Sequence, residues 1–126
     1  MRKYLLLFLL LTGCTHITQV VATLEFYDRR PMFEIPEIYS EWYADTEDCL
    51  GKMGNFLDIN WYTATEIIYD DREKLGIVQH PNDITIQIGA RGWRFVLRHE
   101  MSHHISGPEE VIHFDDGSRA ICDGIT

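Results

Sequence analysis

The chain has 126 residues, of which 11 are Lys or Arg and 20 are Asp or Glu, so its formal net charge at pH 7 is -9. This length accommodates one globular domain and excludes an assembly of several domains, and the negative charge argues against sequence-independent nucleic-acid binding, which needs a basic surface. Hydrophobic residues make up 45% of the chain and aromatic residues 12%, which is typical of a packed core rather than of disorder.

The N-terminal segment has the pattern of a secretory signal peptide. A basic start precedes the apolar run Tyr4–Leu11, which is too short to span a bilayer, since spanning takes about 20 residues. The sequence Leu11-Thr12-Gly13-Cys14 resembles the bacterial lipobox, in which the peptide is cut before the cysteine and the cysteine is then acylated. The alternative is an ordinary secretory signal with an incidental cysteine.

The lipobox resemblance implies a signal peptide over residues 1–13 and a lipidated tether over residues 14–19. The lipid on Cys14 would anchor the chain to a membrane without spanning it. The implied location is the bacterial cell envelope, at the outer membrane or the periplasmic face if the bacterium is Gram-negative.

The two remaining cysteines, Cys49 and Cys122, form an even pair in a compartment that permits disulfides. We favour one bridge between them, which would close a loop of about 70 residues and contribute roughly 4 kcal/mol in the chain-entropy model. Two free thiols or two cysteines that bind a metal are the alternatives, although neither cysteine has a Cys-x-x-Cys partner.

The predicted domain covers residues 20–126. Its first segment, Val20–Tyr27, is apolar and β-branched enough for a strand. A helix is predicted from Pro36 to about Leu50, because proline is favoured in the first turn of a helix and glycines at positions 51 and 54 end it.

Alternation of apolar and polar residues predicts three strands in the middle of the chain. They cover Phe56–Thr65, Lys74–Gln79 and Ile84–Ile88, with Ile84, Ile86 and Ile88 on one face. A charged turn is expected at Asp70–Lys74. Apolar spacing then predicts a helix over Trp93–Ile105, with Trp93 on its core side, before Gly107-Pro108 ends it. Together these elements predict an α+β fold, in which a small antiparallel or mixed sheet packs on two helices.

The motif that carries chemistry is His99-Glu100-Met101-Ser102-His103, an H-E-x-x-H pattern on the last predicted helix. Residues i and i+4 of a helix share one face, so both imidazoles can bind one Zn²⁺ at about 2.0 to 2.1 Å. Glu100 can then act as general base toward a zinc-activated water without being a ligand. The alternative is that both histidines lie on a solvated helix face.

An H-E-x-x-H helix that closely follows an alternating strand resembles the zincin metallopeptidases, which place a substrate-pairing strand near this helix. The resemblance covers about residues 84–122, and the rest of the chain in outline. It implies a minimal zincin-like domain in a small exported bacterial lipoprotein, with zinc as cofactor and a peptide or protein as substrate. The alternative is a non-catalytic zinc-binding lipoprotein with a structural or partner-binding role in the envelope, since so short a chain leaves little room for a deep cleft.

A catalytic zinc needs a third protein ligand. We favour His113, because imidazole suits zinc and the turn at Gly107-Pro108 lets the chain return to the metal. This arrangement also resembles small exported zincins in which a late His is followed by an aromatic residue and a cysteine bridged to the first helix. Glu109 is the alternative, six residues after His103, where metzincins place their third ligand. The chain departs from that pattern, with Glu in place of His and Ser106 in place of Gly. Further candidates by type are Glu110, Asp115, Asp116 and Asp123.

Stabilising the transition state needs a hydrogen-bond donor that faces the zinc. The donors that qualify by type are Tyr62, Tyr69, Arg119 and His104. His104 points about 100° around the helix from His103, so we expect it at the edge of the core or beside a ligand rather than on the metal. We expect His80, which precedes Pro81, in a turn.

Overall fold

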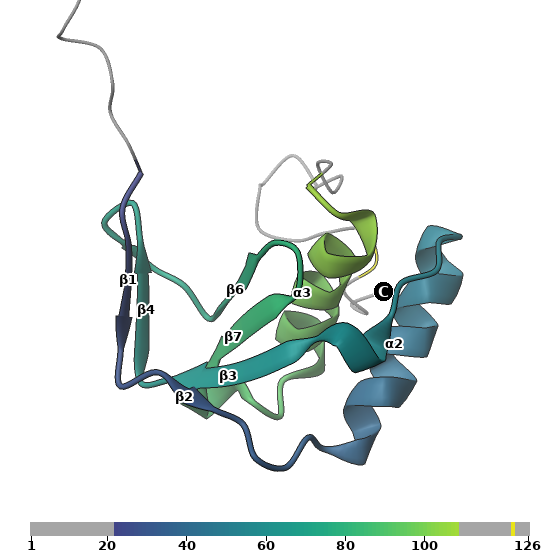
Figure 1. Ribbon diagram of the computed structural model, residues 1–126, viewed down its shortest axis with the longest axis horizontal. Coiled ribbons are helices and arrows are strands. Elements are labelled where there is room, and N and C mark those ends of the chain that lie inside the picture. The colour runs from purple at the N-terminus through teal and green to yellow at the C-terminus, as the bar shows by residue number, and fades with distance from the viewer. Residues whose placement is uncertain (1–21, 109–121, 123–126) are drawn as a thin grey trace, which may run out of the picture.

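The computed structural model of the chain describes residues 22–108 and Cys122 (Figure 1). It contains two α-helices, two short 3-10 helices and seven strands in this part of the chain. In chain order they are β1 (Leu24–Tyr27), β2 (Arg30–Pro31), α2 (Glu37–Leu50), η1 (Phe56–Asp58), β3 (Asn60–Ala64), β4 (Glu66–Tyr69), β5 (Arg72–Glu73), β6 (Gly76–Gln79), β7 (Asp83–Gln87), η2 (Ile88–Ala90) and α3 (Arg94–Ser106). The prediction of a small α+β fold is confirmed.

The strands form two sheets. The first has three antiparallel strands in the order β1-β4-β5, and the second has four strands in the order β2-β3-β7-β6. In the second sheet β3 and β7 are parallel, with Trp61 opposite Ile84, whereas β2 and β6 are antiparallel to their neighbours. Strand β6 therefore lies at an edge of the four-stranded sheet.

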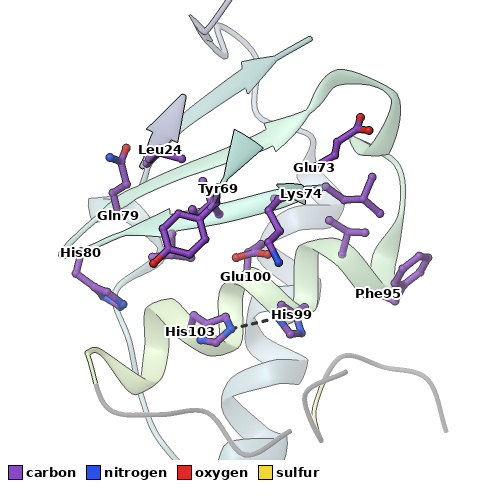
Figure 2. A pocket seen from close by; sticks show the side chains of 15 residues that line it. Leu24, Tyr69, Glu73, Lys74, Gln79, His80, Phe95, His99, Glu100 and His103 are labelled. Atoms are coloured by element: carbon purple, nitrogen blue, oxygen red, sulfur yellow. Dashed lines mark hydrogen bonds between the residues drawn. The ribbon is translucent and has the colours of Figure 1, made fainter. Parts of the chain in front are cut away.

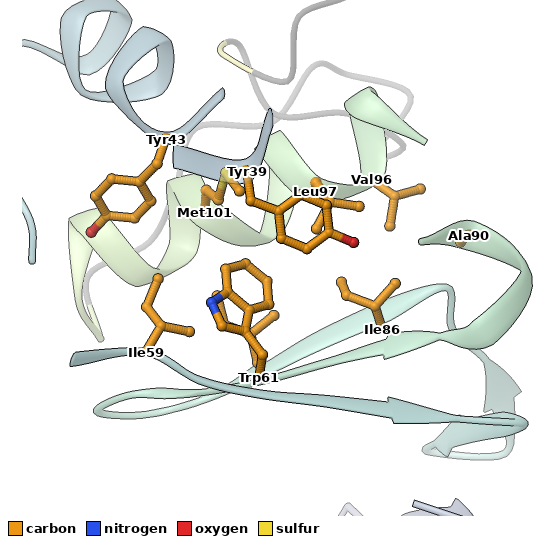
Figure 3. Close-up of a cluster of buried hydrophobic side chains, with 10 residues drawn as sticks. Tyr39, Tyr43, Ile59, Trp61, Ile86, Ala90, Val96, Leu97 and Met101 are labelled. Atoms are coloured by element: carbon orange, nitrogen blue, oxygen red, sulfur yellow. The ribbon is translucent and has the colours of Figure 1, made fainter. Parts of the chain in front are cut away.

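The core lies between the four-stranded sheet and both helices (Figure 3). Trp61 on β3 and Ile86 on β7 point toward Tyr39 on α2 and Leu97 on α3, and the Tyr39 and Trp61 rings are 5.0 Å apart. Helix α2 also packs along α3, where buried Arg98 donates a hydrogen bond to Thr46. One face of α3 is therefore fixed in the core, which determines where its other face points.

The expected charged turn at Asp70–Lys74 is a β-hairpin. Strand β4, which the sequence analysis did not predict, pairs with β5 so that Tyr69 lies opposite Arg72. The two residues between them, Asp70 and Asp71, both have positive φ, at 51° and 61°. Positive φ at both central positions is the mark of a type I′ turn, and Asp tolerates this conformation better than most residues.

Three local predictions differ from the structure. The strand expected over Phe56–Thr65 begins only at Asn60, because the Asn55 side chain accepts a hydrogen bond from the Leu57 N–H and starts η1. Ile88 leaves the face of Ile84 and Ile86 because it lies in η2, and 44% of it is exposed. Trp93 caps α3 instead of packing in the core, and 47% of it is exposed.

A disulfide joins Cys49 in the last turn of α2 to Cys122, with their Cα atoms 5.9 Å apart. This is the pairing that the cysteine count favoured. Gly51 follows the helix with φ 65°, in the left-handed region, and its N–H bonds the Glu47 carbonyl. The disulfide therefore ties a distant part of the chain to the end of α2.

Candidate metal centre

The H-E-x-x-H motif lies on α3, and the helical spacing places its two histidines on a different face from the core residues. Val96, Leu97 and Met101 are buried in the core cluster, whereas His99 and His103 are only partly buried. One turn apart on the helix, the two imidazoles face the same cavity (Figure 2).

The two imidazole rings converge on each other. The Nε2 atoms of His99 and His103 are 3.1 Å apart. Two nitrogens bound tetrahedrally to one zinc at about 2.0 to 2.1 Å would be about 3.3 Å apart. The separation of the two nitrogens therefore matches two positions of a zinc coordination shell. The same separation also fits a hydrogen bond between one protonated and one unprotonated ring nitrogen.

Glu100 is buried between α3 and β6, with 7% of the residue exposed. Burial raises the pKa of Glu100 to about 8, and the nearby Lys74 charge lowers it by a smaller amount. Gly76 on β6 makes room for the carboxyl group: a Cβ at this position would lie 2.8 Å from Cγ of Glu100. A dication held by the two histidines would favour the carboxylate form.

The cavity beside the motif has a volume of about 720 Å³ and is bounded by three parts of the molecule (Figure 2). Helix α3 forms one wall with the motif and Phe95, and residues 74–80 form a second wall that includes β6. The three-stranded sheet forms the third wall through Leu24, Tyr69 and Glu73. Apart from the motif, the polar side chains that line the cavity are Tyr69, Glu73, Lys74, Gln79 and His80.

The hydrogen-bond donors that the sequence suggested for transition-state stabilisation lie in different parts of the structure. Tyr62 lies outside the cavity, beneath the Arg29 guanidinium, whose Cζ is 3.6 Å from the centre of the Tyr62 ring. Tyr69 lines the cavity. Two further residues, Lys74 and His80, also line it. Sequence reasoning missed Lys74, because no local pattern shows that a lysine 25 positions before His99 faces the motif.

His104 lies at the edge of the core, as its position on the helix predicts. Its Nδ1 lies 2.9 Å from the Tyr43 hydroxyl and its Nε2 lies 3.1 Å from Oδ1 of Asn82. A neutral ring with the proton on Nε2 donates to Asn82 and accepts from Tyr43, so both bonds are made at once. Burial, followed by the charge of His80, lowers the pKa of His104, which favours this neutral form.

The candidates for the third ligand, His113 and Glu109, lie outside the described residues, as do Arg119 and the lipidation site Cys14. Within residues 22–108 and Cys122, no three His, Cys, Asp or Glu side chains gather closely enough to hold a metal ion. In the same part of the chain, neither helix combines the length and apolar character needed to cross a membrane.

Comparison with known protein families, with curated proteins and with solved structures finds no match to this chain.

Proposed function

We propose that the chain is a zinc-dependent hydrolase of the zincin type, a peptidase, held at a membrane of the bacterial envelope by a lipid on Cys14. The observation that carries the proposal is the 3.1 Å separation of the His99 and His103 Nε2 atoms, with a buried carboxyl on the residue between them in the motif. His99 and His103 would hold Zn²⁺ together with a third ligand, His113 or Glu109.

The chemistry divides between the metal and the chain. When bound, zinc polarises the carbonyl and lowers the pKa of water. Glu100 removes a proton from the attacking water, whose oxygen bonds to the carbonyl carbon while the C–O π pair moves to the carbonyl oxygen. Glu100 then passes that proton to the leaving nitrogen as the C–N bond breaks. The second proton of the water, now on the new carboxyl group, moves to the amine, so the products are a carboxylate and an ammonium group.

The position of β6 supports a peptide as the substrate. Among the described residues β6 pairs only with β7, and the motif helix lies beside it. An extended peptide can add to such a sheet edge through main-chain hydrogen bonds, which do not depend on its side chains. A peptide bound there would lie along the cavity that contains His99 and Glu100.

Zinc content and peptide hydrolysis, measured on the same preparations, test the proposal. We expect one zinc per chain in the wild type and loss of zinc in His99→Ala. Glu100→Gln should retain zinc and lose at least about 100-fold in kcat, the usual contribution of a general base. Glu73→Gln is the matched control, because Glu73 is an exposed carboxyl on the same cavity.

Two results would contradict the enzyme. Hydrolysis that is undiminished in Glu100→Gln would remove the base from the mechanism. A closed shell of four protein ligands without exchangeable water, seen by X-ray absorption, would instead favour the non-catalytic zinc-binding lipoprotein.

A further inference from the structure

Lys74 is a cationic side chain in the cavity of the motif. It is half-buried and lines the same cavity as His99, Glu100 and His103, and Figure 2 shows it reaching toward Glu100 and His99. The chain has nearly twice as many acidic as basic residues. A lysine beside the motif therefore calls for a functional explanation.

The backbone at Lys74 is fixed on both sides. The Lys74 N–H donates to the Ile67 carbonyl on β4 at 2.8 Å, and the Leu75 carbonyl accepts from the Gln87 N–H on β7 at 2.8 Å. Lys74 and Leu75 therefore stand at the junction of the two sheets, with Lys74 bonded to the three-stranded sheet and Leu75 to the four-stranded sheet. A side chain that starts from a fixed backbone can be aimed, which a preorganised donor requires.

The other donors in the described residues are less suited to stabilising a negative charge. Tyr62 lies under Arg29, and His104 is engaged with Tyr43 and Asn82. Tyr69 shares the cavity, but its hydroxyl is neutral, and hydrogen bonds from a charged donor are about twice as strong as neutral ones. Among the described residues of the strand wall, 74–80, Lys74 is the one lysine or arginine, and His80 stands at the opposite end of this wall.

We propose that the Lys74 ammonium donates a hydrogen bond to the carbonyl oxygen that becomes negatively charged as water adds to the peptide bond. This rests on the proposed function, and it makes Lys74 a second catalytic residue of the chain beside Glu100. The ammonium lies in a partly enclosed cavity, where its attraction for an oxyanion is stronger than in bulk water.

Binding of a phosphinic peptide, a stable mimic of the tetrahedral anion, tests this role without hydrolysis. Affinity is measured on zinc-supplemented wild type, Lys74→Met, Glu100→Gln and the double variant, after thermal unfolding and zinc content confirm that each is folded and loaded. We expect Lys74→Met to weaken binding by about 100-fold, as the removal of one oxyanion donor does. Most of this loss should persist in the Glu100→Gln background, changed only by the coupling between the two neighbouring charges.

Three controls test whether the Lys74 ammonium itself binds the anion. Lys74→Arg keeps the charge and should keep most of the affinity. Arg72→Met removes an exposed cation two residues earlier that does not line the cavity, and should change nothing. The planar amide peptide of the same sequence, measured in the Glu100→Gln background so that it is not cleaved, should bind Glu100→Gln and the double variant within about twofold of each other, because it carries no oxyanion.

The outcomes separate the two proposals. If the loss disappears in the Glu100→Gln background, Lys74 acts through Glu100 and the inference is wrong. Equal losses for the phosphinic and amide peptides would also overturn it, because Lys74 would then bind the ground state. If wild type hydrolyses peptides but Lys74→Met binds the phosphinic peptide with full affinity, the proposed peptidase function stands and the inference about Lys74 is wrong. If wild type binds neither zinc nor the phosphinic peptide, both fail.

Discussion

The two sheets of the molecule differ in the elements that pack against them. The four-stranded sheet has both helices on one face, and its residues Trp61, Ile84 and Ile86 belong to the central buried cluster. The three-stranded sheet contributes no residue to that cluster, yet its Leu24 and Tyr69 form a wall of the cavity. The difference indicates that one sheet holds the fold together while the other shapes access to the motif, so the two can be perturbed separately.

The largest expected contrast comes from two isoleucines that are both fully buried, Ile84 on β7 and Ile67 on β4. Ile84→Ala leaves a cavity inside the central cluster and should cost about 4 kcal/mol of unfolding free energy, near the upper part of the range for such changes. Ile67→Ala lies outside that cluster, on a strand where Ile67 is the one buried residue, and should cost about 2 kcal/mol.

Urea unfolding of both variants measures this contrast. Equal costs would mean that the three-stranded sheet is as firmly packed as the other, and the division of roles between the sheets would be wrong.

Glu100 lies between the parts of the molecule that the two sheets form. Titration of its buried carboxyl should change the free energy of unfolding by a smaller amount that depends on pH. Because its pKa is raised from 4.5 to about 8, the folded chain binds this proton more tightly than the unfolded chain does. Stability of the metal-free protein should therefore fall as the pH rises from about 4.5 to 8. Glu100→Gln does not titrate, so it should lose at least about 1 kcal/mol less than wild type between pH 5 and pH 9.

Chelator-treated protein, unfolded in urea at both pH values, provides the measurement. Glu73→Gln, which removes an exposed carboxyl from the same cavity, is the matched control. If wild type and Glu100→Gln show the same loss, the Glu100 carboxyl is not buried in a way that shifts its pKa.

The smallest expected contrast uses one hydroxyl in each region. Tyr43→Phe removes the partner of His104 Nδ1 at the edge of the core and should cost about 1 kcal/mol, as loss of one partly buried hydrogen bond does. Tyr69→Phe changes a residue on the three-stranded sheet that is 39% exposed and should cost less than about 0.5 kcal/mol. Thermal unfolding near neutral pH distinguishes them, and a larger loss in Tyr69→Phe would reverse the comparison.

The sequence predicts those features that depend on local spacing. The helices end where proline and glycine predict, and α3 presents His99 and His103 together because residues i and i+4 always share a face. The α+β class and the Cys49–Cys122 pairing also follow from pattern and count.

Other features depend on contacts between distant segments, so local patterns do not reveal them. Strand β4 is only four residues long, and its partners lie in β1 and β5. That pairing brings Tyr69 to the cavity, and a bond to β4 fixes Lys74 there. Likewise Tyr62 and Tyr69 are equivalent as residue types, and only the fold places one beneath Arg29 and the other beside the motif.

The close approach of Glu100 to Gly76 extends the motif beyond its five residues. Any side chain at position 76 would meet the carboxyl group, since a Cβ there lies 3.1 Å from both Cδ and Oε1 of Glu100. A homologue could thus keep His-Glu-x-x-His letter for letter and still displace the glutamate if this one glycine were replaced. Glycine 24 residues upstream of the glutamate is therefore a searchable sequence criterion for separating homologues with an intact site from degenerate ones.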